Sequence, residues 1–234
     1  MKRNPPNLFF VDHLEELRSR LIKCLLAFFL GTCLVYPFLD SFLRLIVQPV
    51  GTLVFTAPSE ALVVRLQLAL WGGFFLALPV MIYQIWMFVS AALTEPEKKY
   101  VLFFAPASFL LFVAGAAFAY FVMIPFCLSF FLSFSRDWLV PMITVKNYLS
   151  FAGTFVLAFA VTFELPLILM FLTKIGIATP AFLIQKRRHA IVLILIVSAV
   201  ITPPDVVSQI IMACPLMILY EIGIFFSRLT YRKK

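Results

Sequence analysis

The side chains best suited to chemistry in this sequence are carboxylates placed just outside its long apolar stretches. Asp12, Glu15 and Glu16 precede the first stretch, and Glu95 and Glu97 lie in the short segment between the second and the third. Carboxylates match the planar fork of a guanidinium, which donates two parallel hydrogen bonds to each of them. If these acids converge, the sequence predicts a binding site for an arginine-like cation at a membrane surface.

Both acidic groups also have an ordinary structural explanation. Glu16 and Arg20 are four residues apart, a spacing at which helical side chains pair and contribute about 0.2–0.5 kcal/mol. Glu95 and Glu97 flank Pro96 at the expected start of a helix, where acids interact favourably with the helix dipole. From the spacing alone, both explanations remain open.

A further acid, Glu164, lies inside the apolar stretch 147–173, with Pro166 two positions after it. An ionised side chain at bilayer depth costs about 3 kcal/mol on insertion scales, so such residues usually face a helix bundle or a wet cavity. The placement suits either a polar point inside a helix bundle or the coupling site of a proton-driven transporter of small solutes. Such a transporter ordinarily has an internal repeat, and the sequence shows none.

No catalytic motif accompanies these acids. G-x-S-x-G, H-E-x-x-H and G-x-x-x-x-G-K-[ST] are absent, and His13 and His189 are isolated residues at expected span ends. The four cysteines stand singly in apolar stretches without a C-x-x-C pair, which argues against a zinc site or a disulfide framework. We therefore expect no enzyme activity, no cofactor and no metal. An intramembrane protease would lack its nucleophile and base.

The elements that position these residues must be membrane helices. Of the 234 residues, 63% are hydrophobic and 13% are charged, and the mean hydropathy is +1.05. Only a bilayer covers so much apolar surface. We predict an all-α, polytopic single membrane domain over residues 1–234, with an external cap at about 40–65. Its six spans are expected at about 22–39, 66–90, 103–134, 149–173, 189–202 and 206–227.

The basic residues indicate the orientation of these spans. With six spans, 15 of the 19 Lys and Arg residues lie on the side that holds both termini. The positive-inside rule then places both termini in the cytoplasm, so the net charge of +8 follows membrane sidedness, and we expect no nucleic-acid partner. Basic clusters flank both ends of the last apolar region, which favours a short hairpin turning outside at Pro203 and Pro204 over one kinked span. No cleavable signal is evident, so the first span is expected to be retained.

Prolines lie inside several predicted spans. Pro79, Pro106, Pro125 and Pro166 each remove a backbone hydrogen-bond donor, so the helices are expected to be kinked. Gly115 and its small neighbours give the third span a face for close helix contact.

The motifs along the chain resemble those of the TatC family, a subunit of the twin-arginine protein translocase. The resemblance covers nearly the whole chain, with several motifs in the family's order and spacing. These are residues 13–18, 79–88, 97–99, 118–121, 163–166, 202–209 and 219–221. One departure is the segment 90–93, where many relatives have a proline shortly after the position of Phe88.

The resemblance implies a receptor in the bacterial cytoplasmic membrane, or in its archaeal or organellar equivalent. Such a receptor binds the twin-arginine signal peptides of folded cargo, recruits TatA- and TatB-type subunits, forms homo-oligomers and is driven by proton-motive force without nucleotide. The family's arginine-recognition acids match Glu16 and Glu97. Gln84 and Phe88 match positions beside that site, and Arg18 belongs to the same N-terminal motif.

The resemblance also implies a glove-shaped fold with tilted helices around a concave face. Glu164 matches an acid that points into this face, and Gln209 matches a polar position near the contact surfaces for TatA and TatB. Pro49 and Glu60 would belong to a periplasmic cap formed by the first loop. The outer turn of the last hairpin would comprise Pro203, Pro204 and Asp205.

Overall fold

The computed structural model describes residues 6–50, 53–91, 93–134, 142–202 and 205–231, except for the side chains of residues 6–12, 95–97 and 99. Within this part of the chain, helices alternate with short turns and one isolated β-bridge, so the predicted all-α class is confirmed. The chain divides into two compact units: unit 1 is residues 1–46 with 57–109, and unit 2 is residues 47–56 with 110–234. The single membrane domain and the glove shape with its concave face stay predictions.

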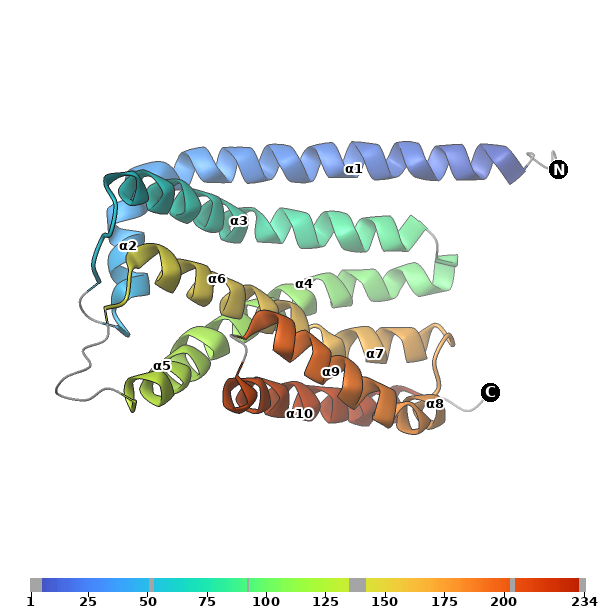
Figure 1. Cartoon of the computed structure of the whole chain (residues 1–234). Coiled ribbons are helices and arrows are strands. Elements are labelled where there is room, and N and C mark those ends of the chain that lie inside the picture. The colour runs from blue at the N-terminus through green and yellow to red at the C-terminus, as the bar shows by residue number, and fades with distance from the viewer. Residues whose placement is uncertain (1–5, 51–52, 92, 135–141, 203–204, 232–234) are drawn as a thin grey trace. The chain divides into compact units, whose positions relative to one another are not determined.

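Unit 1 is built around two long helices that lie side by side, α1 (Pro6–Val35) and α3 (Pro58–Ala91) (Figure 1). Glycines bring them together: a Cβ atom on Gly31 would lie 2.7 Å from the carbonyl oxygen of Gly73. A Cβ atom on Gly73 would lie 2.6 Å from the backbone nitrogen of Thr32. Small residues allow such backbone approach between membrane helices, and here no larger residue fits without moving the helices apart.

The region predicted as an external cap, about 40–65, is largely helical. After a 3₁₀ turn at Tyr36–Phe38, α2 (Leu39–Val47) occupies its first part. Helix α3 begins at Pro58, earlier than the predicted residue 66. A proline suits the first turn of a helix and an acid there favours the helix dipole, so the polar segment containing Glu60 extends α3 beyond its apolar core.

Helix α4 (Glu95–Phe118) follows α3 after a short connection and continues into unit 2. Unit 2 contains a π-helical turn at Ala119–Met123 and six further helices among the described residues. These are α5 (Ile124–Leu132), α6 (Val145–Thr162), α7 (Leu165–Lys174), α8 (Pro180–Gln185), α9 (Arg187–Ile201) and α10 (Val206–Thr230).

Helix α6 contributes large buried side chains to the core of unit 2. Phe155 and Phe159 are fully buried, and the ring of Phe118 packs edge-on against Phe159 at 5.6 Å between centroids. A Cβ atom on Gly115 would lie 2.7 Å from the carbonyl oxygen of Phe159, so this glycine lets α4 approach the backbone of α6. The close contact predicted for the small-residue face around Gly115 is therefore present.

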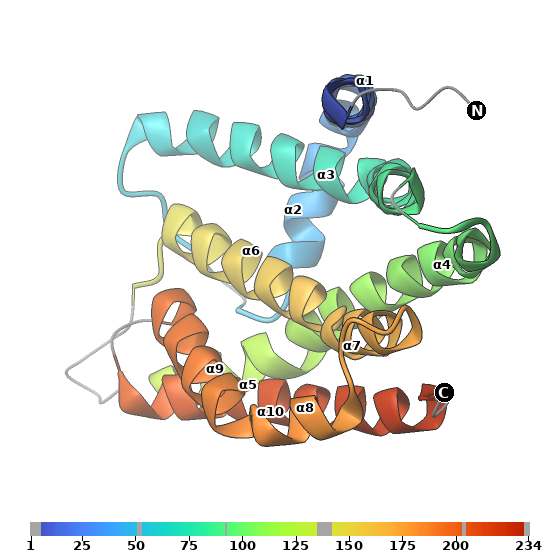
Figure 2. The same cartoon turned by 90° about the vertical axis from the view of Figure 1, so that its right-hand side faces the viewer.

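The predicted helix break at Pro166 is confirmed. Helix α6 ends at Thr162 and α7 begins at Leu165, with the proline in the first turn of α7, where its missing N–H costs no helical hydrogen bond. Pro79 lies inside α3, which changes direction along its length in Figure 2. Pro125 follows the π-helical turn, a widening of the helix that the sequence did not predict.

Five helical stretches of the described chain are long and apolar enough to cross a membrane. They are His13–Val47, Pro58–Ala91, Tyr100–Leu132, Val145–Lys174 and Val206–Thr230. Helix α9 has 15 residues, about 22 Å at a rise of about 1.5 Å per residue, which is short for a span. The chain is thus a multi-pass membrane protein. The sixth span, expected at 189–202, is not confirmed.

Candidate functional site

Three of the predicted binding residues, Glu16, Gln84 and Phe88, come together where α1 faces α3. Arg20 joins two of them: its Nε donates to Oε1 of Glu16 at 3.0 Å, and its Nη1 donates to Oε1 of Gln84 at 3.2 Å. Nη2 of Arg20 also donates to Oε1 of Glu16. One guanidinium therefore bridges a carboxylate on α1 and an amide carbonyl on α3.

His13 completes this cluster from the preceding turn of α1. Its ring stacks on Phe88 with centroids 4.5 Å apart and an interplanar angle of 22°. Its Nδ1 lies 3.8 Å from Oε2 of Glu16. The sequence predicts His13 to be an isolated interfacial residue, but its spacing of three from Glu16 is the signal that both share a helix face.

Local helix geometry explains why these residues meet. His13, Glu16 and Arg20 are spaced by three and four residues, so they form one stripe along α1. Gln84 and Phe88 are four apart and form a matching stripe on α3. The glycine contact between α1 and α3 brings the two helices close enough for these stripes to touch.

The cluster is partly shielded from solvent. The side chain of Arg20 is 17% exposed and that of Glu16 is 29% exposed. Charged groups interact more strongly when water is partly excluded, so this pair is held more firmly than a fully exposed ion pair. The arrangement can bind one planar cation between two acceptors, with an aromatic pair beside it.

Glu97 lies in the first turn of α4, in the same unit, and its side chain is outside the described residues. The connection before it is anchored by Trp86, whose Nε1 donates to Oγ of Ser108 at 2.8 Å and whose ring stacks on Phe104. These contacts fasten the end of α3 to α4. Arg18, the remaining predicted binding residue, is exposed on α1.

Glu164 lies in the turn between α6 and α7, in unit 2. It occupies the N-cap position of α7 without a side-chain cap hydrogen bond, and its Oε1 atom is buried. Its backbone carbonyl accepts from the N–H of Ile168 at 2.9 Å. The partial positive charge of a helix N-terminus favours a carboxylate there, which reduces the cost of holding this acid at membrane depth.

Gln209, predicted to contact partner subunits, is engaged within the chain. Its Nε2 donates to the backbone carbonyl of Leu195 at 3.0 Å, which links α10 to α9. At the start of α9, Nη2 of Arg187 donates to Oε2 of Glu221 at 2.6 Å. These two bonds hold the middle and the start of α9 against α10.

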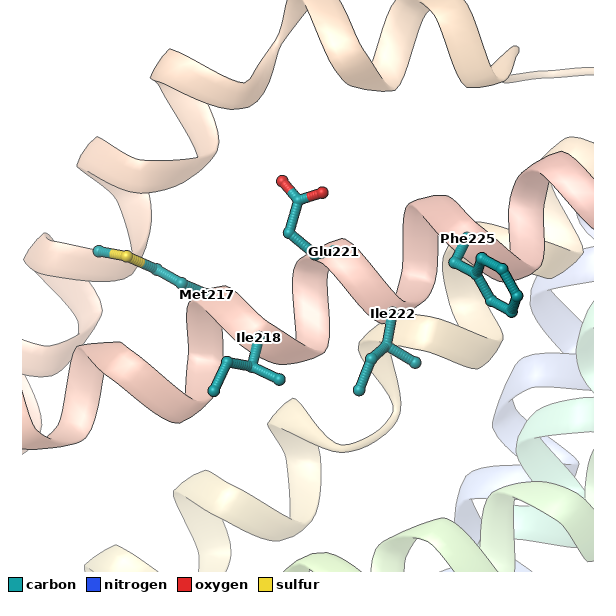
Figure 3. Close-up of a pocket in the computed structure, with 5 residues that line it drawn as sticks. All are labelled: Met217, Ile218, Glu221, Ile222 and Phe225. Carbon is teal, nitrogen blue, oxygen red and sulfur yellow. The ribbon is translucent and has the colours of Figure 1, made fainter.

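An apolar groove follows one face of α10 near Glu221. Figure 3 shows its lining side chains projecting from this one helix, with the Glu221 carboxylate on the other side of the ribbon from Ile218 and Ile222. The lining residues are Met217, Ile218, Glu221, Ile222 and Phe225. Glu221 belongs to the motif at residues 219–221, which predicts no role for it.

The predicted cap and turn residues have structural roles. Asp205 caps α10, since its carboxylate accepts from the N–H of Ser208 at 2.7 Å. Pro203 and Pro204 lie outside the described residues. Pro49 is part of a turn that follows α2, and Glu60 is buried in the first turn of α3.

The chain matches a known family over most of its length. The family model described as Sec-independent protein translocase protein (TatC) matches residues 12–215. A protein with this description from Carboxydothermus hydrogenoformans is 39% identical over 239 residues, covering 100% of this chain and 98% of the relative. The protein described as TatCd from Bacillus subtilis is 38% identical over 225 residues, covering 96% of this chain and 93% of the relative.

Solved structures show the same similarity. A crystal structure described as the twin-arginine translocase receptor TatC matches with a TM-score of 0.84 and 37% identity. The match covers 94% of this chain and 100% of that chain. A second crystal structure of this receptor, in DDM, also has a TM-score of 0.84 and covers 91% of this chain.

Proposed function

Because the chain belongs to the TatC family of Sec-independent protein translocase proteins, we propose that it is the signal-peptide receptor of a twin-arginine translocase. Members of this family are protein translocase subunits, not enzymes, and work with other Tat subunits. In this proposal, the cluster of Glu16, Gln84 and Phe88 binds an arginine of the signal peptide. Glu97 supplies a second carboxylate, and Arg18 flanks the site on α1.

The observation that carries the proposal is the guanidinium held between Glu16 and Gln84. The side chain of Arg20 demonstrates that the two acceptors are spaced to bind a guanidinium through three N–H groups. A lysine ammonium is a compact point charge without a planar edge, so it matches this pair of acceptors less well. A site of this kind suits a peptide defined by arginine.

The wider assembly follows from the same proposal. Both termini lie in the cytoplasm, so the site at the start of α1 faces the cytoplasm and meets cargo before export. TatA- and TatB-type subunits and further copies of this chain join the complex, with Gln209 near their contact surface. Export is driven by proton-motive force, and Glu164 provides a polar point at membrane depth on a concave face.

A proton-coupled transporter of small solutes using Glu164 is not favoured. The family match extends over residues 12–215, and both solved relatives are described as a translocase receptor. The transporter alternative predicts proton-dependent uptake of a solute by the purified chain in liposomes, with loss of uptake in Glu164→Gln.

Peptide crosslinking tests the receptor proposal. A photoreactive twin-arginine peptide is added to membranes that contain the full chain or its Glu16→Gln variant. The variant is expected to lose about tenfold of the crosslinked product or more, because a hydrogen bond to a charged group contributes about 1.5–3 kcal/mol. Glu15→Gln is the matched control, since it removes the same charge from an exposed neighbour on the same helix. Equal crosslinking by the wild-type chain and Glu16→Gln contradicts the proposal.

A further inference from the structure

The place proposed for a signal-peptide arginine is filled by a side chain of the protein itself. Both acceptors of the site, Oε1 of Glu16 and Oε1 of Gln84, accept hydrogen bonds from Arg20. We propose that Arg20 is an internal occupant of the arginine site, which a signal-peptide arginine displaces before making the same contacts. This inference rests on the receptor function proposed above and adds how the site is regulated.

Displacement fits the geometry better than sharing. Arg20 directs two of its N–H groups to one oxygen of Glu16 and a third to the single carbonyl oxygen of Gln84. A second guanidinium making the same contacts needs the same oxygens. It would also place a second positive charge within a few ångströms of the first, which is unfavourable in a partly shielded site.

The displaced Arg20 side chain can adopt another position outside the site. It lies on α1 near the expected membrane surface, and a long arginine side chain can extend along the helix so that its guanidinium reaches water or lipid headgroups. Water still reaches the occupant, because its side chain and that of Glu16 remain 17% and 29% exposed. An external peptide that binds through two arginines and further contacts can therefore compete with it.

An internal occupant lowers the affinity of the receptor for every peptide that uses the site. It leaves the selectivity between twin-arginine and twin-lysine peptides unchanged. The apparent affinity of any ligand is its affinity for the open site multiplied by the fraction of molecules in which the site is open. This factor is the same for a twin-arginine and a twin-lysine peptide, so the ratio of their affinities does not depend on Arg20. The lowered affinity keeps weakly binding cationic peptides from occupying the site.

Removal of the occupant tests this inference directly. The full-length Arg20→Gln variant in lipid nanodiscs is expected to bind a labelled twin-arginine peptide about threefold to tenfold more tightly than the wild-type chain, the range expected for a partly exposed ion pair. A twin-lysine peptide should gain by the same factor. The control is Lys23→Gln, which removes the same charge from an exposed position three residues further along α1 and should leave both affinities unchanged.

Arg20→Lys provides a second variant that keeps the charge and the helix. A lysine at this position makes a single-point contact in place of the fork, so the peptide is expected to bind more tightly than to the wild-type chain and less tightly than to Arg20→Gln. This variant decides the question if Arg20→Gln does not fold.

The outcomes separate this inference from the receptor proposal. If the wild-type chain binds the peptide through Glu16 but Arg20→Gln and Arg20→Lys bind it equally or more weakly, the occupant model is overturned and Arg20 only positions Glu16. A gain confined to the twin-lysine peptide also overturns it. If the wild-type chain shows no Glu16-dependent binding, the receptor proposal itself fails.

Discussion

At the scale of single residues, the decisive feature is a bridge between a charged pair and a distant amide. Glu16 and Arg20 are four residues apart, and helix geometry alone brings them together. Gln84 is 64 residues from Arg20 along the chain, and its hydrogen bond turns a common surface pair into a site with two acceptors. His13 and Phe88 add an aromatic stack at the same place.

The shared use of Gln84 leads to a prediction for a double-mutant cycle. If Arg20 and the peptide use the same carbonyl, Gln84→Leu weakens the binding of the peptide and also that of the competing Arg20 side chain. The two effects oppose each other, so in a chain that keeps Arg20 the apparent peptide affinity changes little. In an Arg20→Gln background no occupant is released, so Gln84→Leu is expected to weaken peptide binding by about threefold to fivefold. Glu16→Gln differs from Gln84→Leu. The peptide affinity lost with the Glu16 charge is larger than the threefold to tenfold affinity gained when Arg20 is released.

Peptide titration of the four proteins in lipid nanodiscs measures this cycle. The matched control is Gln67→Leu, which removes a similar amide from the same helix, away from the cluster. Additive effects of Gln84→Leu and Arg20→Gln would contradict a shared acceptor.

At the scale of elements, glycine contacts decide how closely the helices that carry the site approach. A Cβ atom on Gly73 would lie 2.6 Å from backbone atoms of Thr32. This steric overlap can be removed only if α1 and α3 separate. At the neighbouring Gly72, the close atoms belong to the side chain of Val35. Two adjacent positions on α3 therefore meet different kinds of obstacle.

This difference predicts unequal effects of two matched substitutions. Gly73→Ala is expected to lower the free energy of unfolding by about 1–3 kcal/mol, the usual cost of overpacking, after any gain in helix propensity. Gly72→Ala makes the same chemical change on the same helix and should cost less, because a side chain can adjust where a backbone cannot. Thermal unfolding of both variants in detergent measures the difference.

The function of Gly73→Ala provides an independent measurement. Separating α1 from α3 moves Gln84 away from Arg20 and Glu16, so peptide binding should also weaken in this variant. If Gly73→Ala and Gly72→Ala were equally stable, the backbone contact would not control the spacing of these helices.

At the scale of the whole molecule, the open question is how many times the chain crosses the membrane. Five stretches are long enough to do so, while α9 has only 15 residues. A short apolar helix is accommodated by local thinning of the bilayer or by association with other helices, each at modest cost. The basic residues before α9 and after α10 favour two crossings, with both flanks on the cytoplasmic side.

Cysteine labelling tests the predicted topology. In a chain whose four native cysteines are replaced, Cys introduced at Thr56 and at Val206 should react with an impermeant reagent added from outside. Cys introduced at Gln185 and at Tyr231 should react only after the membrane is permeabilised. All four positions are exposed, so the accessible side and not burial controls the reaction. If positions 185 and 206 react from the same side, α9 does not cross and the six-span prediction is wrong.

The sequence by itself determined those features that depend on composition and on neighbours along the chain. The apolar stretches required membrane helices, Pro166 placed the break between α6 and α7, and the spacing of Glu16 and Arg20 made their pairing available. Each of these follows from a backbone rule that acts within one or two helical turns.

Only the tertiary structure decided which distant side chains meet. The Arg20–Gln84 bond and the His13–Phe88 stack depend on how far α1 slides along α3, which glycine contacts between the two helices set. The same is true of the bond from the amide of Gln209 on α10 to the backbone of α9. Packing registers of this kind arise from complementary surfaces that are far apart in the chain, so no local pattern contains them.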